Sequence, residues 1–156
     1  MAQDVKTAEQ ILQEKGGELY SVGEDATILE ALRLMVENKV GSTLVEEGSR
    51  PVGIYTERDL MRNTIDPSFD PGTARIGDYM TRGLKFAPHT DNAYELMDKF
   101  LGLRLRHLLI DRDGQFIGLL SIGDVIRSAL QERTRELEAL QLVVQWEYHE
   151  EWKPRR

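Results

Sequence analysis

Two short motifs in the chain place a hydroxyl-bearing residue three positions ahead of an aspartate. Thr56 precedes Asp59, and Ser121 precedes Asp124. Each motif follows an apolar run and opens a stretch of helical character, so the two side chains would lie one turn apart near one face of a helix start. A hydroxyl there can donate to a phosphate oxygen, and a carboxylate can accept from both hydroxyls of a ribose. These residues therefore suit the binding of a nucleotide.

The same side chains also have a purely structural interpretation. Serine or threonine at a helix start commonly caps the helix, and aspartate in the first turn compensates the helix dipole. A single copy of the motif would favour that interpretation. Two copies at equivalent places favour a ligand in at least one site.

The motifs belong to a longer internal repeat. When the sequence is shifted by 65 positions, its two halves align without a gap, and residues 53–59 fall on residues 118–124. What repeats is mainly the order of hydrophobic class and turn residues. Each half predicts the order β-α-β-β-α, with an Asp-Gly hairpin signal in the second half. The expected elements are 19–22, 27–38, 43–46 and 51–55, then 84–87, 91–101, 107–111 and 116–120, with closing helices from Thr56 and Ser121.

The expected fold class is α/β (α+β), with two β-α-β-β-α repeats packed as a pseudo-twofold module. A lone unit of about 50 residues can hardly bury a sufficient core, so the two units must pack their sheets together. Prolines and a glycine mark residues 63–73 as the linker. The expected divisions are repeat 1 at 7–66, repeat 2 at 74–131 and a C-terminal helical extension at 132–156.

At this point the pattern resembles the CBS (cystathionine β-synthase-type) domain family over roughly residues 7–130. The resemblance implies two pseudo-symmetric clefts between the repeats, each able to take an adenosine-containing ligand, commonly AMP, ADP or ATP. Some relatives bind S-adenosylmethionine or dinucleotides, and such modules often dimerise into a flat disc. The segments that carry the resemblance are 52–60 and 117–125, supported by 29–35, 77–81 and 104–111.

The resemblance implies ligand contacts outside the two motifs. Val40 and Leu105 match positions whose apolar side chains flank adenine. Arg106 matches a position that often binds phosphate in nucleotide-sensing relatives. Arg58 is a further candidate for charge-assisted bonds to phosphate, with a solvated surface arginine as the alternative.

Three more candidates complete the expected site. Tyr20 and Lys85 match first-strand positions near the base, with core or rim packing as the alternative. His107 is expected as a strand residue at the cleft mouth rather than as a base. The full expected ligand-binding set is Thr56, Arg58, Asp59, Ser121, Asp124, Arg106, Tyr20, Val40, Lys85, Leu105 and His107.

The two halves differ at several matched positions, so we expect two unequal sites, one of them preferred. The second repeat has Arg104 and Arg106 near its cleft, which suits a polyphosphate or another anionic ligand. The matched positions that differ are Arg58 and Gly123, Gly41 and Arg106, and the segments 13–15 (Gln-Glu-Lys) and 78–80 (Asp-Tyr-Met).

Several other functions are disfavoured. The chain has no cysteine, and its three histidines show no metal-ligand spacing, so we expect no metal site. No catalytic motif is present, so the protein is not expected to be an enzyme, and no cofactor is required. The net charge of −7 argues against nucleic acid. Without a signal peptide or a membrane-length apolar run, we expect a cytoplasmic protein that does not bind membranes.

The closing helix of the second half is expected to run from Ser121 to about Trp152, because no proline and no glycine after Gly123 interrupts it. Its apolar stripe favours a homodimer contact, with packing along its own module as the alternative. The leading function is an adenine-nucleotide sensor that regulates a separate partner protein; the alternative is a ligand-free scaffold that works through this helix. The apolar residues concerned are Ile126, Leu130, Leu137, Leu140 and Val144, with Leu142, Val143, Trp146 and Trp152.

Overall fold

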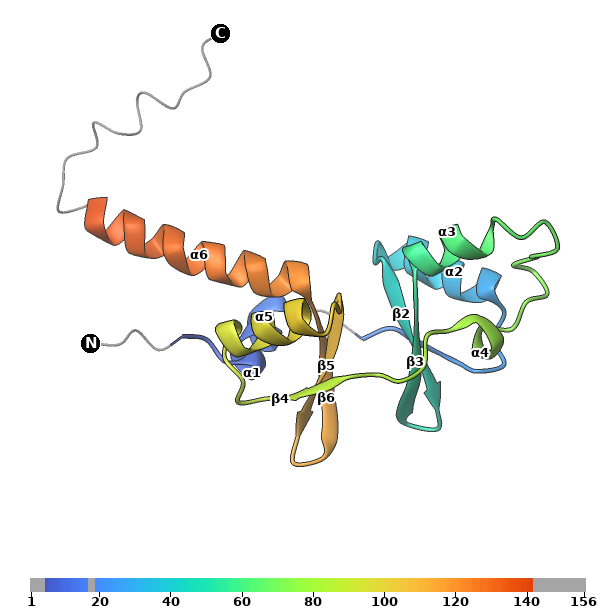
Figure 1. Cartoon of the computed structure of the whole chain (residues 1–156), viewed down its shortest axis with the longest axis horizontal. Coiled ribbons are helices and arrows are strands. Elements are labelled where there is room, and N and C mark those ends of the chain that lie inside the picture. Colours follow the sequence, from blue (N-terminus) through green and yellow to red (C-terminus); the bar gives the residue numbers. More distant parts are fainter. Residues whose placement is uncertain (1–4, 17–18, 142–156) are drawn as a thin grey trace, which may run out of the picture.

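The computed structural model describes residues 5–16 and 19–141, with side chains of the last helix described as far as Glu138. This part of the chain contains six helices and six strands, in the order α-β-α-β-β-α repeated twice (Figure 1). The mixed α/β class is confirmed. In chain order the elements are α1 (Ala8–Lys15), β1 (Ser21–Gly23), α2 (Ile28–Asn38), β2 (Ser42–Glu47), β3 (Arg50–Thr56), α3 (Glu57–Asn63), α4 (Ile76–Tyr79), β4 (Phe86–Pro88), α5 (Ala93–Gly102), β5 (His107–Arg112), β6 (Gln115–Ser121) and α6 (Ile122–Gln141).

The strands form two three-stranded sheets of identical topology. In the first, β1 lies parallel to β2 and β2 antiparallel to β3; β4, β5 and β6 repeat this arrangement. Each hairpin carries a register shift at the same place, between Val45 and Glu46 and between Ile110 and Asp111. The repeat found in the sequence is therefore a repeat of backbone structure.

Local sequence signals explain the matching elements. Thr27 caps α2 through a capping box with Glu30, and Asn92 caps α5 in the same way with Glu95. The second hairpin turns through residues 113–114, which both have positive φ, as an Asp-Gly turn requires. These elements are fixed by residues close to one another in the chain.

The leading helix of each repeat packs against the other repeat, which the sequence did not predict. The Ala8 N–H of α1 donates to the Asp91 carbonyl oxygen at 2.7 Å, beside α5. The Ile76 N–H of α4 donates to the Ala26 carbonyl oxygen at 2.8 Å, beside α2. Figure 1 shows α1 beside α5 and α6, and α4 beside β3. The two repeats are therefore joined by an exchange of helices.

Glycines make room for these crossing helices. A Cβ atom on Gly53 of β3 would lie 2.3 Å from Met80 Sδ, and one on Gly118 of β6 would lie 2.7 Å from Leu12 Cδ2. Both distances are shorter than real contacts of a Cβ atom, so a side chain at either glycine would displace the Met80 or Leu12 side chain packed against it.

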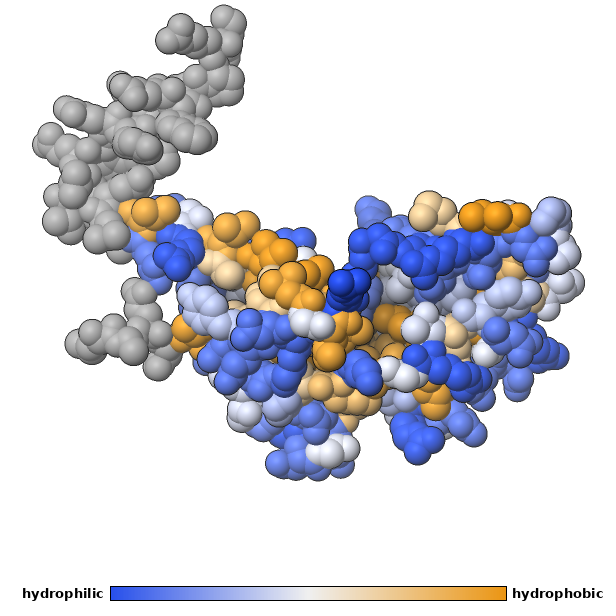
Figure 2. Space-filling model, viewed as in Figure 1, coloured by the Kyte–Doolittle hydropathy of each residue, from blue (hydrophilic) through white to orange (hydrophobic). Residues whose placement is uncertain are grey.

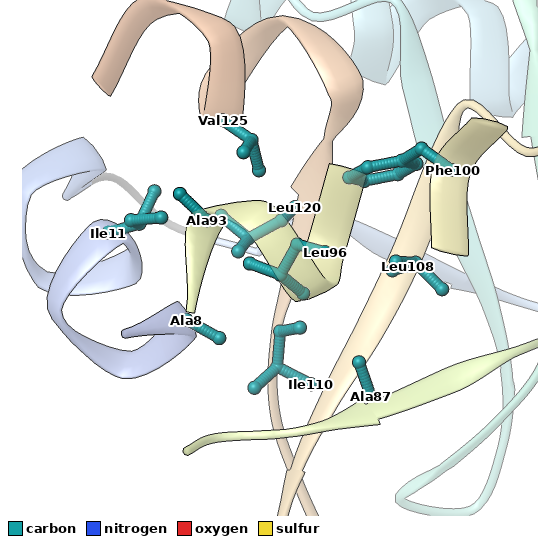
Figure 3. Packing of buried hydrophobic residues seen from close by; sticks show 10 residues of the cluster. All are labelled: Ala8, Ile11, Ala87, Ala93, Leu96, Phe100, Leu108, Ile110, Leu120 and Val125. Carbon is teal, nitrogen blue, oxygen red and sulfur yellow. The ribbon is translucent and has the colours of Figure 1, made fainter. Parts of the chain in front are cut away.

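The buried side chains form three clusters. The first joins α1 to β4, β5, β6, α5 and α6, and Figure 3 shows Ile11 of α1 facing this group. The second joins α4 to α2 and the strands of the first sheet. The third lies between the two sheets and confirms that the sheets pack together. Its buried members are Leu44, Ile54, Leu109 and Leu119.

The segment expected to be a linker is partly folded onto repeat 1. Phe69 packs against the second cluster, and the Pro71 carbonyl oxygen accepts from the Leu29 N–H at 2.9 Å. Helix α6 continues without a break past residue 131, and the expected extension from Leu142 onward lies outside the described residues. Within the described ranges, no helix is both long enough and apolar enough to cross a membrane.

Candidate functional site

A cleft of about 640 Å³ lies between the two repeats. Both Thr/Ser-x-x-Asp motifs line this cleft. The resemblance implied two clefts, whereas the structure has one continuous cleft that both motifs share. All eleven residues expected to bind ligand lie on its wall. Their contact with a ligand remains a prediction. They are Tyr20, Val40, Thr56, Arg58, Asp59, Lys85, Leu105, Arg106, His107, Ser121 and Asp124.

The turn from helix to strand delivers matched residues to the cleft in both repeats. Lys39 follows α2 with φ of 55°, and Arg104 follows α5 with φ of 54°. This left-handed conformation is uncommon for residues other than glycine. It sets Val40 and Leu105, which come directly after, onto the cleft wall. The two apolar candidates for adenine thus occupy equivalent positions.

The helix start in the first repeat bonds mostly to its own chain. Thr56 Oγ1 accepts from the Asp59 N–H at 3.3 Å and donates to Asp59 Oδ2 at 3.0 Å, while the Thr56 N–H donates to the same oxygen at 2.9 Å. The Glu57 N–H donates to the Gly41 carbonyl oxygen at 3.1 Å. The capping interpretation of this motif is therefore correct, and Asp59 Oδ1 is the oxygen that these bonds leave for a ligand.

The second repeat has the same cap. Ser121 Oγ accepts from the Asp124 N–H at 3.1 Å, and Asp124 Oδ2 accepts from the Ser121 N–H at 2.8 Å. The Ile122 N–H donates to the Arg106 carbonyl oxygen at 2.9 Å. In each of these two helices, two of the first three backbone N–H groups are thus already bonded within the chain. Fewer of them are free for an anion than the sequence suggested. An anion at these helix starts would therefore depend mainly on side-chain cations.

Asp124 differs from Asp59 because it carries an ion pair. Lys15 Nζ lies 2.9 Å from Asp124 Oδ2 and donates to the Leu119 carbonyl oxygen at 3.0 Å. Burial opposes ionisation of Asp124, but the hydrogen bonds from the Ser121 N–H and from the Lys15 ammonium outweigh it and lower the pKa of the carboxyl. Asp124 is therefore a carboxylate at neutral pH.

Two neighbouring groups are held neutral. Burial lowers the pKa of His107, and the positive charge of Lys15 lowers it further. Burial, together with the charge of Asp59, raises the pKa of Tyr55 to about 12, and its hydroxyl donates to Asn63 Oδ1 at 2.8 Å. Neither group carries a charge at neutral pH, so neither alters the charge of the cleft.

The cleft is positively charged although the protein is acidic. Seven lysines and arginines line it against three carboxylates, an excess of four positive charges in a chain of net charge −7. Three of these cations were not expected near the cleft from the sequence: Lys15, Arg62 and Arg82. The repeat offers one signal for Lys15, since it stands where the second repeat has Met80. Arg104 was expected near the cleft, though not among the ligand-binding residues.

The arrangement combines apolar walls, a carboxylate and clustered cations, which are the complements of a base, a ribose and phosphates. Within the described part of the chain, no group of three histidine, aspartate or glutamate side chains is placed to hold a metal ion. The cleft is thus suited to an anionic organic ligand.

Comparison with known proteins gives consistent matches. The CBS-domain-containing protein CBSX3, mitochondrial, from Arabidopsis thaliana is 33% identical over 129 residues, which cover 80% of this chain and 63% of that protein. A solved CBS-domain-containing protein from Agrobacterium tumefaciens is 28% identical, with a TM-score of 0.73 over 80% of this chain and 99% of that chain.

A third match is a solved structure of CBSX2 in complex with AMP. It is 26% identical, with a TM-score of 0.63, and the match covers 81% of this chain and 98% of that chain. The family model of the CBS domain matches twice, at residues 5–66 and 76–131. The chain therefore belongs to the CBS domain family and contains two copies of the domain.

Proposed function

We propose that this protein is a regulatory module that binds an adenine nucleotide in the cleft between its repeats. The observation that carries the proposal is the excess of positive charge in a cleft that also contains apolar walls and a carboxylate. In an acidic protein, such a focus of positive charge raises the local concentration of anionic ligands. The AMP bound in the CBSX2 structure supports the adenosine part of the proposal.

Each part of the ligand has a complement in the cleft. Val40 and Leu105 offer apolar surface for adenine, and Asp59 accepts from the ribose hydroxyls through Oδ1. Arg58 and Arg106 offer charge-assisted hydrogen bonds to phosphate. Because the excess of positive charge exceeds what one phosphate group needs, we propose that ATP or ADP binds more tightly than AMP.

The proposed output is regulation rather than catalysis. The two neutral groups beside the carboxylates, His107 and Tyr55, are not poised for proton transfer near pH 7. We propose that nucleotide binding across the two repeats alters how the module contacts a separate partner protein. A cytoplasmic location and the absence of nucleic-acid and membrane binding remain predictions.

A thermal-unfolding panel tests the function directly. The full chain is heated alone and with AMP, ADP, ATP, NAD(H) and S-adenosylmethionine. A ligand that binds only the folded state adds about 2.7 kcal/mol at one hundred times its Kd. We expect the largest rise in Tm with ATP or ADP. No rise with any of these ligands at millimolar concentration contradicts the proposal.

A pair of variants shows whether the cleft is responsible. Asp59→Ala is expected to abolish the rise in Tm, because it removes the ribose acceptor. Asp98→Ala, which changes an exposed residue of α5 outside the cleft, is the matched control and is expected to keep it. If Asp59→Ala shows the same nucleotide-induced rise in Tm as Asp98→Ala, the ligand binds outside the cleft.

A second candidate function is a homodimeric scaffold, favoured by the outer face of α6. Ile126, Leu130 and Leu137 are exposed there, Leu130 at 61%. Figure 2 shows hydrophobic surface over this helix. Apolar side chains in a row on one helix face are typical of a contact with another helix.

Sedimentation separates the two candidates. The full chain is compared with a chain that ends at Glu132, each with and without ATP. A dimer that is lost on truncation and insensitive to ATP favours the scaffold. If both chains sediment as monomers, the dimer contact is excluded. In thermal unfolding of the same two chains, a rise in Tm with ATP favours the nucleotide module.

A further inference from the structure

Lys15 contacts Asp124, the residue of the second repeat that matches Asp59 of the first. It is the last residue of α1, and the helix ends there because Gly16 follows with φ of 57°. Since α1 packs on the second repeat, the lysine side chain enters the cleft beside β6. There its ammonium contacts both Asp124 Oδ2 and the Leu119 carbonyl oxygen. Two acceptors therefore fix the ammonium in one position.

The carboxylate of Asp124 has little left to offer a ligand. Its side chain is only 11% exposed. Oδ2 accepts from the Ser121 N–H and from Lys15, and Oδ1 lies 3.6 Å from Arg127 Nη1. A ribose could reach this carboxylate only by displacing the ammonium, and a neutral hydroxyl is a weaker partner for a carboxylate than a cation is.

The matched position in the other half is built differently. Met80 stands where Lys15 would, only 8% exposed, with its sulfur against Gly53. Among the described residues, Asp59 forms no ion pair, and the hydrogen bonds that its carboxylate accepts all go to Oδ2. Asp59 thus lines the cleft without a counterpart of the ammonium that Lys15 places on Asp124.

We infer that Lys15 is a specificity-determining residue that closes the Asp124 half of the cleft to ribose. The chain then binds one nucleoside unit, in the Asp59 half. The inference rests on the proposed nucleotide function and adds a defined stoichiometry and a defined half. It also predicts that Lys15→Met opens the Asp124 half, because methionine is the residue at the matched position, Met80, beside the Asp59 half.

Isothermal titration of the full chain with ATP tests the inference. The wild-type chain is expected to bind one ATP per chain, and Lys15→Met to bind two. Lys15→Arg keeps a cation beside Asp124 and is the matched control, expected to bind one. In the double variant with Lys15→Met and Asp59→Ala, one site remains, whereas Asp59→Ala alone leaves none.

The outcomes separate this inference from the proposed function. The inference is wrong if the wild-type chain binds two ATP molecules. It is also wrong if Lys15→Met binds only one ATP while its circular dichroism spectrum shows that it is folded as the wild type is. Either result leaves the nucleotide function intact. If Lys15→Met does not fold, Asp59→Ala alone decides. Undiminished binding by that variant places the nucleoside outside the Asp59 half and overturns the inference. A wild-type chain that binds none of the adenosine ligands overturns both proposals.

Discussion

The two repeats have matching strands and matching caps on their central and closing helices, yet they place different charges at matching positions of the cleft. β2 and β5 begin at Ser42 and His107, and β3 and β6 end at Thr56 and Ser121, at a constant offset along the chain. At the cleft, by contrast, Gly41 lines the wall in one repeat where Arg106 does in the other. The backbone is set by a pattern that tolerates substitution, whereas the chemistry of each half depends on single side chains.

The largest expected difference between the repeats lies in their cores. Phe100 and Met35 occupy matched positions on α5 and α2, and both are buried. Phe100 belongs to the cluster that α1 and α6 close, whereas Met35 is not a member of any of the three clusters. Phe100→Ala is expected to lower the free energy of unfolding by about 3–5 kcal/mol and Met35→Ala by about 2 kcal/mol. Urea unfolding at equilibrium measures both, and equal losses would contradict the difference.

The next effect concerns phosphate selectivity. Arg106→Ala is expected to weaken ATP binding about tenfold while changing AMP binding much less, because a charge-assisted bond to the outer phosphates is worth roughly that factor. Titration calorimetry with both nucleotides measures the ratio. Arg50→Ala, in the first hairpin and outside the cleft lining, is the control. An equal weakening of AMP and ATP would place Arg106 at the base or ribose instead.

A smaller effect is expected at the helix caps, where the two repeats are alike. Thr27→Ala and Asn92→Ala each remove one capping box. Each is expected to cost about 1 kcal/mol of unfolding free energy. Thermal or urea unfolding measures both, with Thr90→Ala, an exposed residue outside any helix, as the control. Costs that differ severalfold would show that the two helices do not contribute equally to stability.

The smallest effect is a dependence on pH between 5 and 7 at one pair of matched positions, Ser42 and His107. The pKa of His107 is lowered in the folded protein, mainly by burial and then by Lys15, while the matched residue Ser42 does not titrate. Its contribution to stability is therefore present above the unfolded pKa near 6.5 and is lost as pH falls through the lower folded pKa. The Tm of His107→Ser should fall less than that of wild type between pH 7 and pH 5. Parallel curves would exclude His107 as the cause.

The strands, hairpins and central helices could be predicted because their signals are local. The Asp-Gly turn and the capping box of Thr27 and Glu30 need only neighbouring residues to form. Helices α1 and α4 were missed because each is stabilised by the opposite repeat, through contacts that no local pattern reports. Ala8 and Ile76 are buried only once the other half of the chain is in place.

The cleft was predicted in part for the same reason. The repeat brought out Thr56 with Asp59 and Ser121 with Asp124, because both copies stand behind a hairpin. The partner of Asp124 could not be predicted, since Lys15 reaches it from a helix that crosses to the other repeat. The sequence shows that the first repeat has Lys15 where the second has Met80. That this lysine pairs with Asp124 could be seen only in the folded structure.

The exchange of leading helices also determines when during synthesis each repeat can be completed. Helix α1 leaves the ribosome before the second repeat, yet its packing surface includes Leu120 and Val125, which are made much later. The first sheet in turn waits for Ile76 of α4. Because α1 emerges before its distant partners, the apolar face of this helix, with Ala8 and Ile11, stays uncovered until the second repeat follows. Each half of this protein is thus finished by the other, and a stop codon in the linker would leave both the first core and the first helix without a partner.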